Sequence, residues 1–486
     1  MKKTLQLSFL FITVMVSLSN HLLAQTWQEL GTGTNALNPN GGIYSVIADK
    51  QGNVYAAGTF YDTSTQKYYV AKWNGTTWSE LGTGINALNA NDQIFTLAQD
   101  KFGNIYAAGK FTDSAISTKG HRYVAKWDGN SWSELGTGIH ALNANNFINS
   151  VSTDSTGNVY AAGRFTNSPI WSMNGTHYVA KWNGTDWVDL DGLIDSLHKM
   201  GQIGEIQSLV TDKNGYLYAG GNLFDTVYQK YFVARFTGTN WSYMGGHTPT
   251  CIRFLNIATL AVDTSNKAIY EAGYDNYSQN NKNFLSKLYQ GSCSFLGSGT
   301  SSLINDYVLT SAVDINDNYY VAGNFTDSTP NLGYRFVAKW DGTNWSELGT
   351  GANALMANNA INSITTDAQG NVYAAGNFTN GNGKPYVAKY TQPAAGINNL
   401  TNNAAKNDLK VYPNPTTNQL TVSGIQFSGN TKLEVENILG QVMVSLSNHL
   451  TTANCQLTTA NLPSGIYILK ATDEKGFVHT AKFVKE

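Results

Sequence analysis

The aspartates of this 486-residue chain are its most regular candidates for metal chemistry. One stands before each of seven repeated turns: Asp49, Asp100, Asp154, Asp212, Asp263, Asp314 and Asp367. Seven matching carboxylates could indicate Ca²⁺, but calcium needs several oxygen ligands at once and each turn offers one aspartate. An aspartate can instead accept hydrogen bonds from the backbone of its own turn. We therefore predict turn caps and no bound metal.

Histidine and cysteine form no catalytic or metal-binding pattern in the sequence. The eight histidines are scattered, no His/Cys group has zinc spacing, and neither H-E-x-x-H nor G-x-S-x-G occurs. We predict no catalytic residues and no cofactor, and we favour a binding protein over an enzyme. Cys251 and Cys293 are expected on opposite faces of the fold, too far apart for a disulfide.

Tryptophans are the candidates for ligand contact. Ten of the eleven occupy two positions of a repeat, where equal placement favours packing between neighbouring units over a ring of sugar-stacking platforms. Trp171 is the exception, in the polar loop TNSPIWSMNGTH. It is either an anchor for its own loop or a ligand contact. The other candidate contacts are His121, Arg122 and Tyr277, in the matching loops of two other units.

A repeat of 50 to 58 residues positions all of these side chains. Its most regular segment is NVYAAG or a variant, with tyrosines at Tyr55, Tyr106, Tyr160, Tyr218, Tyr270, Tyr320 and Tyr373. Each unit reads as four strands, a to d, joined by Gly-containing and Asn-Gly turns, with W-x-x-L as strand d. Seven such units favour an all-β, seven-bladed β-propeller over a solenoid, which needs distinct capping repeats.

The two ends of the repeat array are complementary. The chain shows TWQELG at 26–31 with no earlier strands, and its last unit, 361–390, lacks a W-x-x-L segment. We predict that 26–31 supplies strand d of the last blade and closes the ring, which removes an exposed strand edge.

Composition and targeting signals limit the partners that the protein can be expected to have. The net charge is −2 without a basic run in the mature chain, so nucleic acid is not an expected partner. Lys2 and Lys3 precede an apolar run, and Ala24 is a small residue, so 1–24 reads as a secretory signal peptide. Nothing later approaches 18 apolar residues, so no membrane span is expected.

The pattern GNVYAAGxF…YVAKWNGxxWxxLG resembles the seven-bladed propeller repeats of secreted and surface bacterial proteins over 25–390. A polar linker is expected at 391–408. The remainder, 409–486, resembles the type A C-terminal sorting domain of the type IX secretion system. The matching residues are Tyr412, Pro413, Asn414, Pro415, Gly440, Gly465 and Tyr467. The resemblance implies a small Ig-like β-sandwich, the secretion machinery as a partner, and a secreted or outer-surface location, with the cargo released or attached to surface lipopolysaccharide.

The sequence is compatible with three functions. The leading hypothesis is a secreted or surface-displayed propeller that binds an extracellular glycan or protein. The alternatives are an extracellular enzyme acting on polysaccharide and a structural surface protein without a discrete ligand. Near-identical blades without a unique acid, base or metal cluster favour the first.

Overall fold

The computed structural model describes residues 26–486 apart from 115–119, 167–176, 191–200, 226–229, 245–255, 266–267, 275–282, 290–291, 298–303, 328–332, 393–408, 424–431, 438–441, 447–453 and 473–477. The chain divides into two compact units, Met1–Ala394 and Ala395–Glu486.

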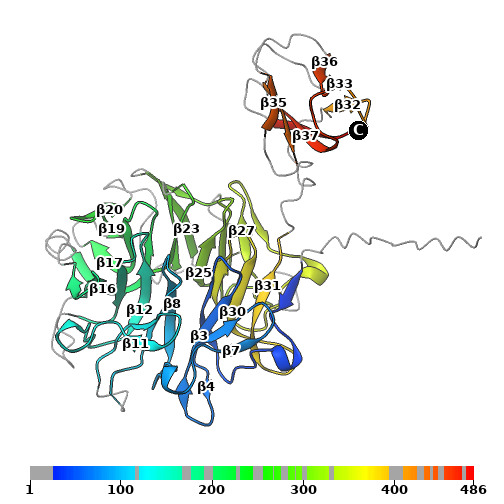
Figure 1. Cartoon of the computed structure of the whole chain (residues 1–486). Coiled ribbons are helices and arrows are strands. Elements are labelled where there is room, and N and C mark those ends of the chain that lie inside the picture. The colour runs from blue at the N-terminus through cyan, green and yellow to red at the C-terminus, as the bar shows by residue number, and fades with distance from the viewer. Residues whose placement is uncertain are drawn as a thin grey trace, which may run out of the picture. The chain divides into compact units, whose positions relative to one another are not determined.

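The first unit consists of seven antiparallel sheets, each with a four-strand path (Figure 1). Blades 1 to 3 are β2 (Ile43–Ala48), β3 (Val54–Gly58), β6 (Ala71–Trp73) and β7 (Trp78–Glu80); β8 (Ile94–Gln99), β9 (Ile105–Gly109), β10 (Ala125–Trp127) and β11 (Trp132–Glu134); and β12 (Ile148–Thr153), β13 (Val159–Gly163), β14 (Ala180–Trp182) and β15 (Trp187–Asp189). Blades 4 and 5 are β16 (Gly201–Thr211), β17 (Leu217–Asp225), β19 (Val233–Phe236) and β20 (Trp241–Met244), with β18 (Lys230–Tyr231) beside β17; and β21 (Asn256–Val262), β22 (Ala268–Tyr274), β23 (Asn283–Tyr289) and β24 (Ser292–Phe295). Blades 6 and 7 are β25 (Val308–Val313), β26 (Tyr319–Gly323), β27 (Ala338–Trp340) and β28 (Trp345–Glu347); and β29 (Ile361–Thr366), β30 (Val372–Thr379), β31 (Pro385–Tyr390) and β1 (Trp27–Glu29).

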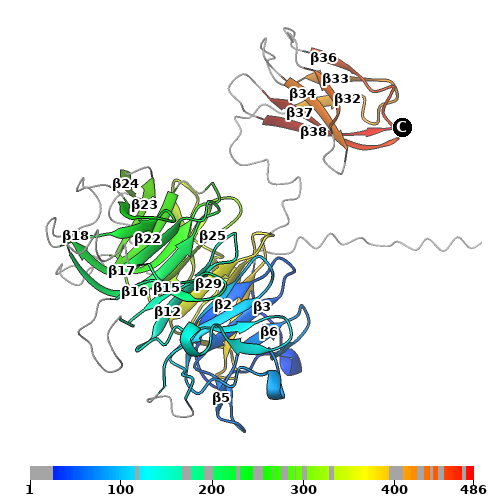
Figure 2. The same cartoon turned by 60° about the vertical axis from the view of Figure 1, so that its left-hand side comes forward.

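The innermost strands form a closed ring. β2, β8, β12, β16, β21, β25 and β29 each contact the next, and β29 contacts β2 (Figure 2). The predicted seven-bladed β-propeller is therefore confirmed. The described helical structure is limited to four short 3₁₀ turns, Gly33–Asn35, Gly84–Asn86, Gly138–His140 and Gly351–Asn353, and a small hairpin of β4 (Tyr61–Asp62) and β5 (Lys67–Tyr68) extends blade 1.

The N-terminal strand completes the last blade, as predicted. β1 pairs antiparallel with β31, and Trp27 lies opposite Tyr390. In Figure 1 the blue strand at the start of the chain lies beside the yellow β31. The backbone N–H of Leu30 extends the pairing by donating to Val387 O at 2.8 Å. Closure therefore leaves no unpaired outer edge on β31.

Each repeated aspartate caps its own turn, which confirms that prediction for the described turns. In blade 1, Asp49 Oδ1 accepts the backbone N–H groups of Gln51 and Asn53 at 2.9 and 2.8 Å. Asp49 Oδ2 accepts from the Asn53 amide at 2.7 Å and from the Tyr55 hydroxyl at 3.2 Å. In blade 3, burial alone would raise the pKa of Asp154, but hydrogen bonds from its turn and tyrosine lower it to about 2.

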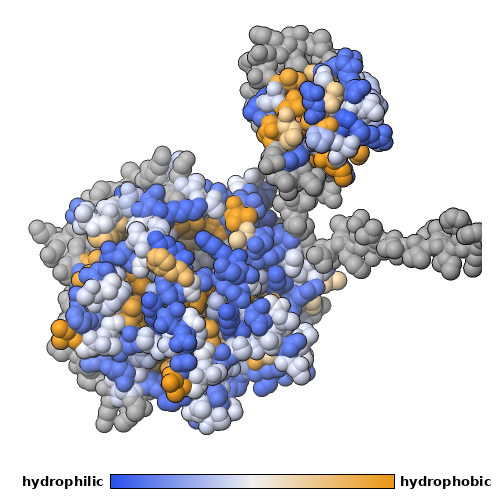
Figure 3. Space-filling model, in the orientation of Figure 1, coloured by the Kyte–Doolittle hydropathy of each residue, from blue (hydrophilic) through white to orange (hydrophobic). Residues whose placement is uncertain are grey.

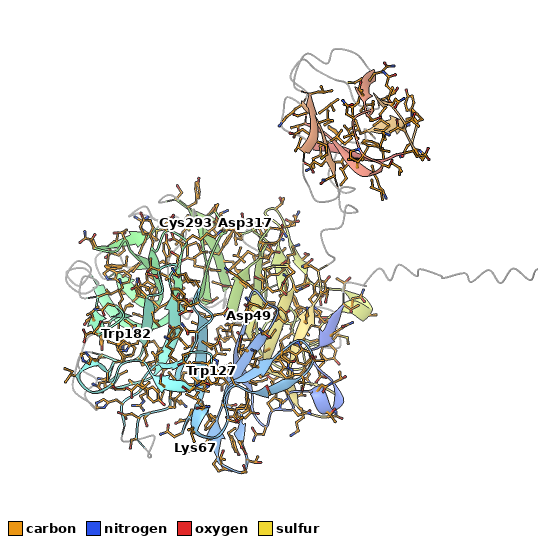
Figure 4. The ribbon with its side chains drawn as sticks, in the orientation of Figure 1. Asp49, Lys67, Trp127, Trp182, Cys293 and Asp317 are labelled. Atoms are coloured by element: carbon orange, nitrogen blue, oxygen red, sulfur yellow. The ribbon has the colours of Figure 1, made fainter. Side chains whose placement is uncertain are left out.

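The strand-d tryptophans bind each blade to its neighbour. Trp132 is 9% exposed, and its indole Nε1 donates to the carbonyl oxygen of Leu81 in the preceding blade at 2.7 Å. The same bond is made by Trp27, Trp78, Trp187, Trp241 and Trp345, each to the leucine that ends the neighbouring W-x-x-L segment or its equivalent. The prediction that these tryptophans pack between blades is confirmed. Trp127 and Trp182 of the c strands are labelled in Figure 4.

Cysteine pairing differs from the prediction. Cys293 lies in β24, where other blades carry the strand-d tryptophan, and it is disulfide-bonded. Cys455 is free, and Cys251 lies outside the described residues. The expectation that Cys293 carries a free thiol is therefore wrong. The repeat places Cys293 on strand d but does not reveal the bond that its sulfur forms.

The second unit is a sandwich of two sheets. One contains β32 (Lys410–Tyr412), β33 (Gln419–Ser423) and β36 (Asn454–Thr458), and the other contains β35 (Val442–Leu446), β34 (Lys432–Asn437), β37 (Gly465–Thr472) and β38 (Val478–Lys485). Both sheets supply the same buried core, which includes Leu420 and Leu457 from the first and Val435, Leu469 and Phe483 from the second. This arrangement fits the expected small β-sandwich.

Candidate ligand-binding site

Every blade carries a β-bulge on its innermost strand. The pairing between the innermost strand and the next strand shifts by one residue in all seven blades. The residues at the shift are Tyr44, Phe95, Asn149, Gln207, Ala258, Leu309 and Asn362. A bulge leaves its extra residue out of the ladder and redirects the side chain, a device found often beside functional sites.

Six of the seven bulge residues line one cavity of about 260 Å³: Tyr44, Phe95, Asn149, Gln207, Leu309 and Asn362. They come from six different blades, so the cavity lies at the centre of the ring. In most blades the bulge lies near the first residue of the innermost strand, which places the cavity toward the face where the d-to-a connections end. We call this cavity and its six lining residues the channel mouth.

The residues on either side of each bulge are nearly constant and have structural roles. The preceding residue is Ile or Val, and the following residue is Ser or Thr. In blade 1 the Ser45 hydroxyl accepts the backbone N–H of Leu97 at 3.0 Å, and across the ring closure Ser363 accepts from Val46 at 3.0 Å. Each hydroxyl thus gives a hydrogen-bond partner to one backbone N–H on the innermost strand of the neighbouring blade. Of these three positions, only the bulge residue in the middle differs freely in amino-acid type from blade to blade.

One side of the channel mouth is aromatic. Tyr44 and Phe95 have ring centroids 5.9 Å apart, and Phe95 and Phe147 have centroids 6.0 Å apart at an interplanar angle of 87°. Phe147 directly precedes β12. All three rings are half-buried, so part of each is accessible. We call these three residues the aromatic wall.

Three cationic side chains surround Phe147. Lys110 Nζ lies 5.2 Å from its ring centroid and 5.6 Å from that of Phe95. The guanidinium carbons of Arg122 and Arg164 lie 5.3 and 5.9 Å from the Phe147 centroid. These distances fit cation–π contacts. Arg164 also forms an ion pair with Glu205, whereas Lys110 forms none with another described residue.

The other side of the channel mouth carries amides. Asn149 Nδ2 donates to Ile206 O at 3.2 Å, and Asn362 Nδ2 donates to Ile43 O at 3.0 Å. Both asparagines therefore use their N–H groups between blades. Their Oδ1 atoms accept no hydrogen bond from another described residue and are not buried, so they are available to a ligand. Gln207 donates to Glu205.

Two of the four predicted contact residues can be placed. Arg122 reaches Phe147, and its Nη1 donates to Asn145 O at 3.1 Å; burial lowers the pKa of its guanidinium while nearby Asp92 raises it. His121 instead turns to Asp113, whose Oδ1 accepts its backbone N–H at 2.9 Å. Trp171 and Tyr277 lie outside the described residues and stay predictions.

Sequence reasoning missed the bulge residues. Their signal was present: within the segment Ile/Val-x-Ser/Thr, the middle residue is Tyr, Phe, Asn, Gln, Ala, Leu and Asn in the seven repeats. Among the described residues no group of His, Cys, Asp or Glu could hold a metal ion. No helix in those ranges is long and apolar enough to cross a lipid bilayer. In the view of Figure 3 the coloured propeller surface is mainly hydrophilic.

The sorting residues of the second unit fix its last strand. The Asn414 side chain donates to Lys482 O at 3.0 Å and accepts the Val484 N–H at 2.8 Å. Tyr467 donates from its hydroxyl to Pro463 O at 2.8 Å, and Gly465 begins β37. Tyr412, the last residue of β32, is half exposed, and Gly440 lies outside the described residues.

Residues 410–486 match the family model described as a secretion system C-terminal sorting domain. The protein carries a type IX secretion sorting domain. The sorting domain directs the chain to the cell surface or the extracellular space and makes the secretion machinery its partner.

Comparison with solved structures finds low-identity matches. PorZ, described as an essential surface component of the type IX secretion system of Porphyromonas gingivalis, is 13% identical; the match covers 92% of this chain and 60% of PorZ, with a TM-score of 0.49. A GH74 enzyme of Niastella koreensis is 15% identical, with coverages of 95% and 69% and a TM-score of 0.47. The WD40 repeats of RRP9 are 10% identical, with coverages of 75% and 97% and a TM-score of 0.47. The chain thus spans 60% of the length of PorZ. No curated protein matches the sequence.

Proposed function

We propose that the propeller is an exported binding module that holds its ligand at the channel mouth. The observation that supports this most is a contrast within the inner strands. Nearly constant residues flank a bulge residue whose amino-acid type differs from blade to blade. A single ligand on a seven-fold frame must be recognised by what differs between blades. Packing alone would favour the same residue in every copy, as it does at the flanking positions.

The alternative of a polysaccharide-acting enzyme has less support. Most glycoside hydrolases use two carboxyl groups on either side of the scissile bond. Of the described carboxylates near the aromatic wall, Glu205 is engaged by Arg164 and Gln207, and Asp92 lies close to Arg122. Amides and aromatic rings are suited to holding a ligand rather than to proton transfer. Display without a discrete ligand would not account for the varied bulge residues.

The experiment uses residues 26–486 as one chain on an array of extracellular glycans and proteins, with release of reducing sugar as a parallel assay. The test variant is Phe95→Asn, which introduces the residue that blades 3 and 7 carry at the same bulge. The control is Ile85→Thr, at a position 97% exposed, where the first 3₁₀ turn carries Thr34.

We expect Phe95→Asn to weaken binding about tenfold or more while the melting temperature stays close to that of the parent, because hot-spot truncations typically cost ~2 kcal/mol. Ile85→Thr should change neither quantity. Equal binding by Phe95→Asn and the parent would show that the ligand does not bind at the channel mouth. Sugar release would favour the enzyme, and silence in every assay would favour a display protein.

A further inference from the structure

We propose that the channel mouth recognises an anionic sugar, a pyranose unit that carries a carboxylate. This inference rests on the binding function proposed above and names the chemical class of its ligand. It depends on three features that meet beside Phe147: unbalanced positive charge, an apolar aromatic wall and free amide oxygens.

Positive charge is concentrated at this point of a chain that is otherwise weakly charged. Charged residues make up 13% of the sequence and the net charge is −2, yet Lys110, Arg122 and Arg164 all lie within 6 Å of one phenyl ring. Glu205 pairs with Arg164, and Asp92 lies close enough to Arg122 to influence its charge. Lys110 has no carboxylate partner among the described residues, so one cation remains for a ligand.

Lys110 is placed where an anion would gain most. Lys110 directly follows β9, and its ammonium lies over the rings of both Phe95 and Phe147. A carboxylate that enters the channel mouth there would form a charge-assisted hydrogen bond next to apolar rings, which exclude water. Sister blades 6 and 7 carry Asn324 and Asn377 at this position, so the fold itself does not require a lysine.

The remaining surfaces suit a sugar ring. The aromatic wall offers apolar area to the C–H face of a pyranose, and Asn149 and Asn362 offer Oδ1 atoms to its hydroxyl groups. The cavity of about 260 Å³ is slightly smaller than the range typical of drug-sized ligands, which fits one sugar unit.

A peptide is the competing ligand, and the inner strands argue against it. Extended peptides usually bind by adding a strand to a free sheet edge. Here the inner edges are occupied, because Ser45, Thr96, Ser150, Ser208, Thr310 and Ser363 each accept a backbone N–H from the neighbouring blade. A bound ligand must therefore be recognised by side chains.

The test measures binding of galacturonate, hyaluronan and alginate oligosaccharides to residues 26–486 by calorimetry, each beside its carboxyl-reduced counterpart. We expect at least one acidic oligosaccharide to bind about tenfold more tightly than its reduced form, and its affinity to fall as salt rises. Lys110→Asn should abolish most of that preference.

Arg122 and Arg335 provide a matched pair of variants. Arg335 Nη1 donates to Asn358 O at 3.2 Å, as Arg122 Nη1 does to Asn145 O at 3.1 Å, but in the next blade Ala360 stands where Phe147 stands. Arg122→Ala and Arg335→Ala should therefore lower the melting temperature by similar amounts. Only Arg122→Ala should weaken binding of the acidic oligosaccharide.

The outcomes separate this inference from the function on which it rests. Equal binding of acidic and reduced forms, both lost in Phe95→Asn, would retain the binding module and overturn the anionic ligand. The same is true if Lys110→Asn leaves the preference intact, or if only peptides bind. Absence of any saccharide or protein binding would overturn both proposals.

Discussion

The indole Nε1 of Trp78 donates a 2.6 Å hydrogen bond to the carbonyl oxygen of Leu30, which follows the N-terminal strand β1. Trp78 belongs to blade 1 and Leu30 completes blade 7, so the bond crosses the point where the ring closes. The same indole-to-carbonyl bond joins other neighbouring blades. The closure is thus built like any other blade interface.

Removal of 26–31 should destabilise the propeller. The deletion removes β1, the Trp27 bond to Leu348 O and the acceptor of Trp78. We expect a loss of about 3–5 kcal/mol, because several hydrogen bonds and a half-buried indole disappear together. Calorimetry measures this loss in the free energy of unfolding. Trp27→Phe keeps an aromatic ring but loses the hydrogen bond, so its loss of stability should be smaller than that of the deletion. An unchanged melting temperature after the deletion would exclude this closure.

Trp132 tests the interface inside the ring. Trp132→Ala should cost roughly 3–5 kcal/mol by leaving a cavity between blades 1 and 2. Trp132→Phe fills part of that cavity but leaves the Leu81 carbonyl without its donor, so it should cost ~1–3 kcal/mol. Urea denaturation provides both values. Two equal losses would mean that the hydrogen bond, rather than packing, dominates.

The disulfide replaces the tryptophan bond that blade 5 lacks. Cys293 occupies the strand-d tryptophan position and is disulfide-bonded. Replacement of Cys293 by serine should cost about 2–5 kcal/mol, because it removes a native disulfide. Thiol labelling after denaturation without reductant should modify Cys455 and leave Cys293 unmodified. Labelling of all three cysteines would contradict the bond.

Glu271 should make stability depend on pH. It stands where five sister blades carry alanine, is 2% exposed, accepts from Ser286 Oγ, and its pKa is raised to about 7 by burial. The folded state therefore keeps a proton that the unfolded state loses above its ordinary pKa. Stability should fall as pH rises from about 4.5 to about 7.

Glu271→Gln removes this dependence because the amide does not titrate. Between pH 5 and pH 7.5 the variant should lose roughly 2–3 kcal/mol less stability than the parent. Glu271→Ala, which restores the residue of the sister blades, should flatten the profile equally. If the parent and both variants share one pH profile, the folded carboxyl titrates normally.

Periodic signals predicted the propeller, because each blade repeats the same residues for the same structural reason. The tyrosine of the NVYAAG segment, the turn aspartate and the W-x-x-L segment all recur. The two ends of the array carry complementary parts of the same repeat, which predicted the ring closure. The binding site could not be found that way, since its residues are the ones that do not repeat. Tyr44 and Phe95 lie in strands, where a bulge that the sequence does not reveal turns them into the cavity.

The cysteine pairing failed for a related reason. The repeat places Cys293 on strand d but does not reveal the bond that its sulfur forms. Arg122 was found for its unusual loop, yet its contact with Phe147 depends on the neighbouring blade. Contacts between blades require the three-dimensional arrangement.

Hydrogen–deuterium exchange with a bound saccharide tests the channel mouth most directly. The ligand should slow exchange in 43–45, 94–96 and 148–150, which carry the bulges of blades 1 to 3, and leave the corresponding residues of blade 5, 257–259, unchanged. Protection confined to the loops of Trp171 and Tyr277, with no change at the bulges, would contradict the account.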